Sequence, residues 1–132
     1  MNTSRRALSR LWLLAIFLLL TTFAAEAQKG TSVVRRVRFP RGRTTAILRG
    51  SVKRGVSHDY LLNARAGQTM TVHLASRGDL SLTVLSPSGE VVADFLRDWS
   101  EVLPLSGDYR INVLPDTSTD APFQYTLEVT IR

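Results

Sequence analysis

The chain alternates apolar and polar residues over short segments, a pattern that indicates half-buried β-strands rather than helices. In residues 69–74, for example, Met70, Val72 and Leu74 share one face while threonine and histidine occupy the other. The same alternation is present in residues 80–85, 109–113 and 125–131. Turns containing glycine, proline or serine separate these segments, so the pattern predicts strands joined by tight turns.

Further strands are expected between these clear examples, in residues 44–52, 59–64, 91–95 and 99–105. About eight strands at a spacing of roughly 8–12 residues are typical of a β-sandwich. The fold class predicted is therefore all-β, a single antiparallel β-sandwich with one buried face on each strand. The polar segment 114–123 has no strand pattern, and we expect an exposed loop there, the kind of element on which binding often resides.

The first residues have a different pattern and predict a secretory signal peptide. Arg5, Arg6 and Arg10 precede an unbroken apolar run over residues 11–20, and Ala25-Glu26-Ala27 gives the small residues at a cleavage site. We therefore expect a cleavable signal peptide in residues 1–27 and one β-sandwich domain in residues 28–132. The product is expected to be periplasmic or secreted.

Composition restricts the chemistry of this domain. The sequence contains no cysteine, so it can form no disulfide and no thiolate metal site. Its formal net charge is +6, but the charge is unevenly distributed. Residues 28–77 contain eleven Lys and Arg and one acid, whereas residues 78–132 contain three Arg and nine acids. The molecule would then have two faces or ends of opposite charge, unless the fold interleaves the two halves of the sequence.

Basic residues gather near the start of the domain, where Arg35, Arg36 and Arg38 alternate with valine and precede Phe39. Such a segment could lie against an anionic envelope surface or bind nucleic acid. It could equally be a solvated edge strand whose charges prevent pairing with other chains. Because an exported protein seldom meets nucleic acid, the edge strand is favoured and no nucleic-acid partner is expected.

No pattern indicates an enzyme. His58 and His73 have no partner at metal-ligand spacing, and motifs for metal, phosphate or nucleophilic chemistry are absent. The acidic residues Asp94, Asp98 and Glu101 are interpreted as a solvated turn. The sequence therefore predicts a non-enzymatic binding protein with no metal and no cofactor.

The strongest candidate for a binding site is the turn Ser106-Gly107-Asp108-Tyr109. Gly107 permits a positive φ, and Ser106 can bond the backbone across the turn. Tyr109 opens a strand with its ring on the apolar face. One interpretation is a structural corner, since many sandwiches place a tyrosine there. The other is a protrusion whose hydroxyl, carboxylate and phenol groups contact a partner protein.

Several segments resemble the bacterial periplasmic inhibitors of g-type lysozyme, in the same order along almost the whole domain. They are residues 37–42 (VRFPRG), 46–53 (AILRGSVK), 59–68 (DYLLNARAGQ), 103–113 (LPLSGDYRINV) and 125–131 (YTLEVTI). The resemblance implies a periplasmic β-sandwich that inserts a loop into the lysozyme cleft. It also implies that Ser106, Gly107 and Tyr109 take part in that contact.

One segment departs from the family. Arginines often occupy the loop before the last strand in these inhibitors, whereas residues 116–120 here are Asp-Thr-Ser-Thr-Asp. A second family, the pre-peptidase C-terminal domains, also resembles the chain through its Ser-Gly-x-Tyr turn. The alternative function is therefore an accessory module that binds the envelope or carbohydrate.

Overall fold

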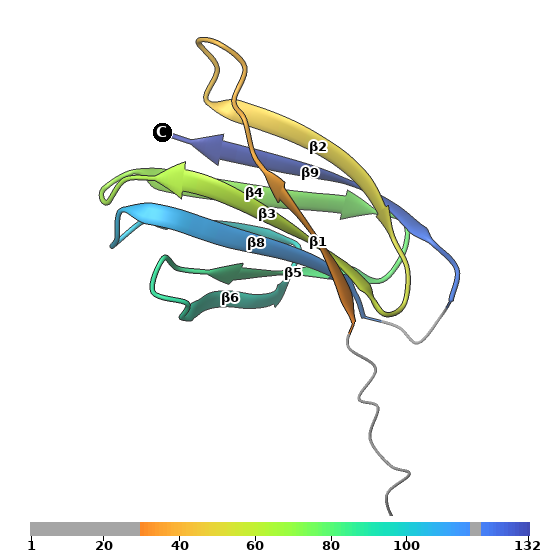
Figure 1. Ribbon diagram of the computed structural model, residues 1–132. Helices are drawn as coiled ribbons and strands as arrows, with labels where there is room; N and C mark the ends of the chain where they lie inside the picture. The colour runs from red at the N-terminus through yellow and green to blue at the C-terminus, as the bar shows by residue number, and fades with distance from the viewer. Residues whose placement is uncertain (1–29, 117–119) are drawn as a thin grey trace, which may run out of the picture.

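A computed structural model describes residues 30–116 and 120–132 of the chain, and the signal peptide expected in residues 1–27 lies outside this part. The described residues form nine strands in two stacked sheets (Figure 1). The strands are β1 Thr31–Arg36, β2 Thr45–Val52, β3 Val56–Ala64, β4 Thr69–Ser76, β5 Leu80–Leu85, β6 Val91–Leu96, β7 Asp98–Val102, β8 Gly107–Pro115 and β9 Phe123–Ile131. No helix in the described part is long and apolar enough to cross a membrane.

The sheets confirm the predicted all-β sandwich. Sheet A has the strand order β1-β3-β8-β5-β6, and sheet B has the order β2-β9-β4-β7. Every pair is antiparallel except β1 with β3, which is parallel. Strand β1 is the basic segment at the edge of sheet A, so the favoured interpretation of an edge strand is confirmed for Arg35 and Arg36.

The core follows from the alternation of the strands. Met70, Val72 and Leu74 of β4 are at most 1% exposed, as their shared face predicts. The alternate residues of β5, β8 and β9 are buried in the same way, and these are Leu80, Leu82, Val84, Tyr109, Ile111, Val113, Tyr125, Leu127, Val129 and Ile131. Burying such side chains is worth about 1.5–3 kcal/mol each, so the apolar layer between the sheets is the main source of stability.

The topology interleaves the two oppositely charged halves of the sequence. Strand β8 pairs with β3, and β9 pairs with both β2 and β4. These pairs join strands of the first half to strands of the second half. The two halves of the sequence are therefore interleaved and do not form separate parts of the molecule.

A polar cluster joins the two sheets inside this apolar core. The hydroxyl of Tyr125 on β9 lies 2.5 Å from the hydroxyl of Tyr60 and 2.6 Å from Nδ1 of His58, both on β3. All three side chains are buried. Gly50 makes room for this cluster, because a Cβ at that position would lie 2.5 Å from the Tyr125 hydroxyl oxygen. We call His58, Tyr60 and Tyr125 the inter-sheet cluster.

Burial in the core favours a neutral His58. Burial and the charge of Arg35 lower the pKa of His58 below its ordinary value of 6.5, and burial raises the pKa of Tyr125. Because the pKa of His58 is lower in the folded protein, the unfolded chain binds the proton at a higher pH. The free energy of unfolding is therefore greatest above the pKa of the unfolded chain and decreases as the pH falls below it.

The free energy of unfolding is therefore expected to decrease as the pH falls below about 6.5. A His58→Gln variant should lose most of this dependence, because the titrating group is removed. His73→Gln is the matched control, since the side chain of His73 is 54% exposed and lies outside the core. Urea unfolding at pH 8 and pH 5 provides the measurement. An equal pH dependence in His58→Gln and wild type would contradict the role of His58.

Candidate functional site

The Ser106–Tyr109 turn follows the segment after β7 and includes the first three residues of β8, at one end of the sandwich. Gly107 is the first residue of β8 and has a φ of +139°, a conformation that side-chain-bearing residues rarely adopt. A Cβ there would also lie 2.9 Å from Cβ of Pro87, in the β5–β6 turn. Both restrictions explain why this position is glycine.

Tyr109 forms the structural corner that its spacing suggested. Its side chain is fully buried, and its hydroxyl donates a 2.8 Å hydrogen bond to the carbonyl oxygen of Leu105. The amide of Leu105 approaches the same hydroxyl at 3.4 Å. A hydrogen bond from a buried tyrosine to backbone a few residues upstream is the arrangement of a tyrosine corner. The phenol group therefore points into the protein and holds residues 105–109 in a fixed loop.

Ser106 connects this loop to a neighbouring turn. Its Oγ accepts a 2.9 Å hydrogen bond from the amide of Ala66, in the β3–β4 turn. Two backbone hydrogen bonds of 2.8 Å lie beside this contact. The amide of Gly67 donates to the carbonyl of Leu103, and the amide of Leu103 donates to the carbonyl of Gln68. The loop 103–106 is thus tied along its length to residues 66–68, while the hydroxyl proton of the exposed Ser106 is still available to a partner.

Asp108 brings together two segments that the sequence singled out separately. Its carboxylate oxygens lie 2.8 Å and 3.2 Å from the guanidinium of Arg36, and 3.1 Å from Nδ2 of Asn63. These hydrogen bonds, chiefly that from Arg36, lower the pKa of Asp108 to about 2. The carboxylate is therefore charged at any physiological pH and remains 43% exposed.

The residues of the turn that face the solvent are not all those that the sequence predicted to contact a partner. Pro104, Leu105, Ser106 and Asp108 are exposed, whereas Tyr109 is not. The side chains of Val102 and Leu105 are apolar and have exposures of 64% and 42%. The sequence pattern did not identify Val102 and Leu105 as exposed. Both lie close to the buried Leu103, and a run of neighbouring apolar residues does not show which of them face the solvent. We call residues 102–106 together with Asp108 the corner strip.

The corner strip shares its end of the sandwich with other turns. Residues 65–68 and 103–106 are hydrogen-bonded together, and Pro87 of the β5–β6 turn contacts the backbone at Gly107. These turns lie at the left of the ribbon in Figure 1. We call this the corner end.

The other candidate residues do not assemble into a site. Arg36 is engaged by Asp108, so the three arginines at positions 35, 36 and 38 do not form one free basic patch, and their binding to an anionic envelope surface stays a prediction. Asp94 accepts a hydrogen bond from Thr83, and the carboxylate of Asp98 contacts Nδ1 of His73. The described residues contain no group of three or more acidic, histidine or cysteine side chains that could hold a metal ion.

The loop before the last strand is only partly described, because residues 117–119 lie outside the described residues. At its start, the carboxylate of Asp116 accepts a 2.5 Å hydrogen bond from Ser81. At its end, the exposed Asp120 lies 3.8 Å from Arg54. The loop joins β8 to β9 at the end of the sandwich opposite the corner end (Figure 1).

Searches against family models and against curated proteins find no match for this chain. Solved structures do match. The periplasmic inhibitor of g-type lysozyme from Aeromonas hydrophila, PliG, has a TM-score of 0.71 and 28% sequence identity, covering 77% of this chain and 98% of its own. The Salmonella Typhimurium inhibitor PliG has a TM-score of 0.62 and 22% identity over 78% and 99% of the two chains.

The competing family also matches, at a greater distance. The pre-peptidase C-terminal domain of Bacillus anthracis collagenase has a TM-score of 0.52 and 11% identity, covering 76% of this chain and 96% of its own, which shows a common fold alone. The better-matching neighbours are inhibitors rather than enzymes, in agreement with the prediction of a non-enzymatic protein. The structural neighbours thus confirm the resemblance found in the sequence, which is to the periplasmic inhibitors of g-type lysozyme.

Proposed function

We propose that this chain is a periplasmic inhibitor of g-type lysozyme and that it contacts the enzyme with the corner strip. The observation that carries the proposal is the similarity to the Aeromonas hydrophila inhibitor, which extends over 98% of that chain at 28% identity. This similarity supports a lysozyme-inhibitor role. The g-type target, the periplasmic location and the contact surface are parts of the proposal.

The geometry of the corner strip suits insertion into a cleft. Leu105 and Ser106 are exposed at the apex, and hydrogen bonds to Ala66, Gly67 and Gln68 fix the strip from behind. A segment that is already ordered loses little conformational entropy when it binds. The strip would occupy the substrate cleft with an apolar side chain, a hydroxyl donor and the carboxylate of Asp108, and so exclude the polysaccharide.

Within this proposal the four residues of the turn have different roles. Ser106 and Asp108 contact the enzyme directly, because their side chains are exposed. Gly107 and Tyr109 position them, since Gly107 packs on Pro87 and the Tyr109 hydroxyl is used by Leu105. The structural and functional interpretations of the turn are then compatible, with the corner as support for the contact.

The primary test is inhibition of lysis. Purified residues 28–132 should inhibit a g-type lysozyme acting on bacterial cell walls when present at micromolar concentration. A c-type lysozyme assayed in parallel provides the comparison for specificity. Failure to inhibit the g-type enzyme at this concentration would contradict the proposal, and stronger inhibition of the c-type enzyme would contradict the target.

The corner strip itself is tested by Leu105→Glu. Placing a charge at the centre of the contact should weaken inhibition at least about tenfold, a typical effect at an interface hot spot. Stability should change little because the Leu105 side chain is 42% exposed. Leu96→Glu is the matched control, since Leu96 is a 40% exposed leucine at the end of β6 that lies away from the β5–β6 turn. Equal inhibition by the two variants would show that the corner strip does not contact lysozyme.

The supporting role of the corner is tested by Tyr109→Phe. The variant should lower the free energy of unfolding by about 1 kcal/mol, because the Leu105 carbonyl loses its bond to the tyrosine hydroxyl. Inhibition should weaken less than in Leu105→Glu, since no contacting group is removed. Urea unfolding and inhibition assays measure the two effects. Unchanged stability would show that this hydrogen bond does not hold the turn.

A further inference from the structure

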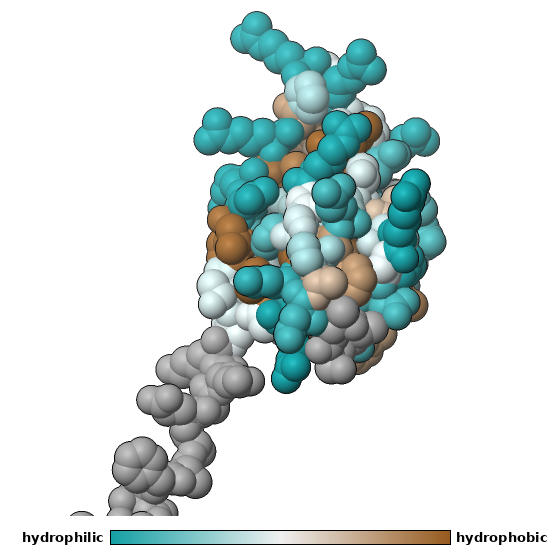
Figure 2. All heavy atoms as spheres, turned by 90° about the vertical axis from the view of Figure 1, so that its right-hand side faces the viewer, coloured by the Kyte–Doolittle hydropathy of each residue, from teal (hydrophilic) through white to brown (hydrophobic). Residues whose placement is uncertain are grey.

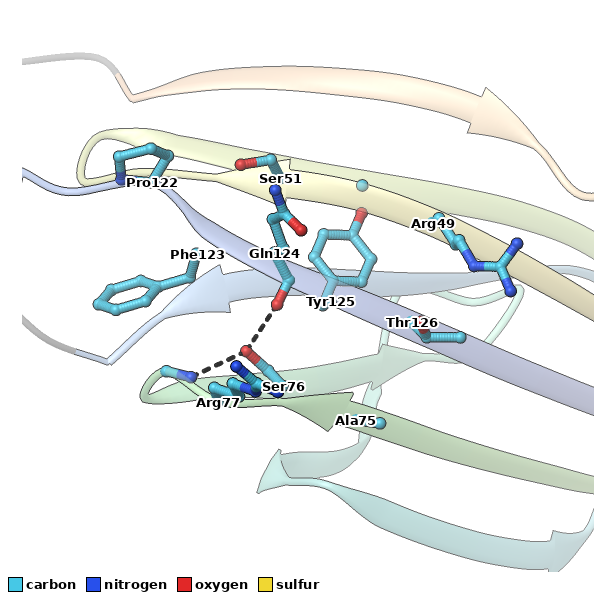
Figure 3. Close-up of a pocket in the computed structure, with 12 residues that line it drawn as sticks. Arg49, Ser51, Ala75, Ser76, Arg77, Pro122, Phe123, Gln124, Tyr125 and Thr126 are labelled. Atoms are coloured by element: carbon cyan, nitrogen blue, oxygen red, sulfur yellow. Dashed lines mark hydrogen bonds between the residues drawn. The ribbon is translucent and has the colours of Figure 1, made fainter.

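A second surface, on the opposite side of sheet B from the core, has the form of an open trough. Its lining residues come only from β2, β4, β9 and the segments next to them (Figure 3). Six residues of the lining lie on the outward-facing side of the three strands and their continuation, and these are Arg49, Ser51, Ala75, Arg77, Gln124 and Thr126. We call this surface the sheet-B trough.

The strand register fixes how these side chains are arranged. Thr126 of β9 lies between Arg49 of β2 and Ala75 of β4, which makes one row across the sheet. The next row contains Ser51 and Gln124, and continuing the register of β4 places Arg77 beside them. The two arginines therefore occupy opposite corners of the trough, roughly 12 Å apart at Cα from the ordinary strand spacing and rise.

Both arginines are exposed and have no acidic partner among the described residues. Arg36 and Arg110, in contrast, are paired with aspartates, and Arg97 donates to the backbone carbonyls of Ser76 and Gly78. The acid on β9, Glu128, lies one row beyond Thr126, opposite Ile47, and does not line the trough. The trough thus presents two guanidinium groups that could form bidentate bonds with carboxylates.

The floor between the arginines carries polar groups, and the exposed Pro122 and the half-buried Phe123 add apolar surface at one end of the trough (Figure 3). Ser51, Thr126 and Gln124 offer hydroxyl and amide groups, and Ala75 is small enough to let a ligand approach the sheet closely. The β4–β5 turn and the start of β9 lie at the right-hand end of Figure 1, and Figure 2 shows that end, where hydrophilic side chains surround smaller apolar areas. Hydroxyl and amide groups suit the hydroxyls of a sugar chain better than the apolar side chains of a peptide.

We propose that the sheet-B trough binds a carboxylate-bearing oligosaccharide. Its carboxylates would pair with Arg49 and Arg77, and its hydroxyls would bond to the polar groups of the floor. The trough is open rather than enclosed, so a segment within a longer glycan chain fits it as well as a chain end does. This site lies on the outer face of sheet B and shares no residue with the corner strip, so it does not depend on the proposed inhibition of lysozyme.

Binding is tested with peptide-free glycan strands of alternating N-acetylglucosamine and N-acetylmuramic acid, whose lactyl groups carry carboxylates. Chitin oligosaccharides of the same length are the neutral comparison, and polyglutamate tests an acidic peptide. Titration calorimetry on residues 28–132 should show binding of the carboxylated strands at least about tenfold tighter than of chitin, and weaker binding at higher salt. Equal affinity for chitin, no binding of the carboxylated strands, or tighter binding of polyglutamate would overturn the proposal.

The residues are tested by the double variant Arg49→Gln/Arg77→Gln, which should weaken binding of the carboxylated strands at least about tenfold. The double variant Arg41→Gln/Arg43→Gln removes the same charge from exposed positions outside the trough and should bind as wild type does. Equal weakening in both variants would mean that overall charge, rather than the trough, binds the glycan. Inhibition of g-type lysozyme should be unchanged in Arg49→Gln/Arg77→Gln, so failure of one proposal can be told from failure of the other.

Discussion

The packing of the two sheets depends on the hydrogen bonds that Tyr125 makes across the core. Its hydroxyl reaches from the second strand of sheet B to His58 and Tyr60 in sheet A, at 2.6 Å and 2.5 Å. A buried hydroxyl without partners is costly, so the sheets must stack in the register that satisfies it. Gly50 contributes by leaving space for the tyrosine ring. An apolar core alone would tolerate several alignments, whereas this polar cluster favours one.

A sandwich fixed in this way can present two separate surfaces. At the corner end, hydrogen bonds from Tyr109 and to Ser106 hold an exposed strip that suits insertion into an enzyme cleft. On the outer face of sheet B, Arg49 and Arg77 lie at opposite corners of the sheet-B trough. An inhibitor that also held a carboxylated glycan would be retained beside the polymer that lysozyme cleaves. Neither surface requires a conformational change for binding, since both are built on strands and short turns.

The sequence was sufficient for most of the fold, because a period of two assigns each strand residue to a face. Tyr109 could be recognised as a corner for the same reason. The partners of His58 could not be found, since Tyr125 is 67 residues away and only the stacking of the sheets brings them together. The parallel pairing of β1 was also missed, because β2 separates β1 from β3 in the chain and belongs to the other sheet, so no local pattern indicates that β1 and β3 pair. As a result, the contact between Arg36 and Asp108 was not foreseen.

The central claim, that the corner strip is the surface that meets lysozyme, is tested most directly by hydrogen exchange with and without a g-type lysozyme. The account predicts that binding slows exchange in residues 102–108 and in the adjoining turn 65–68, and leaves the outer face of sheet B unchanged. Slower exchange confined to β2 and β9, with none at the corner end, would contradict it.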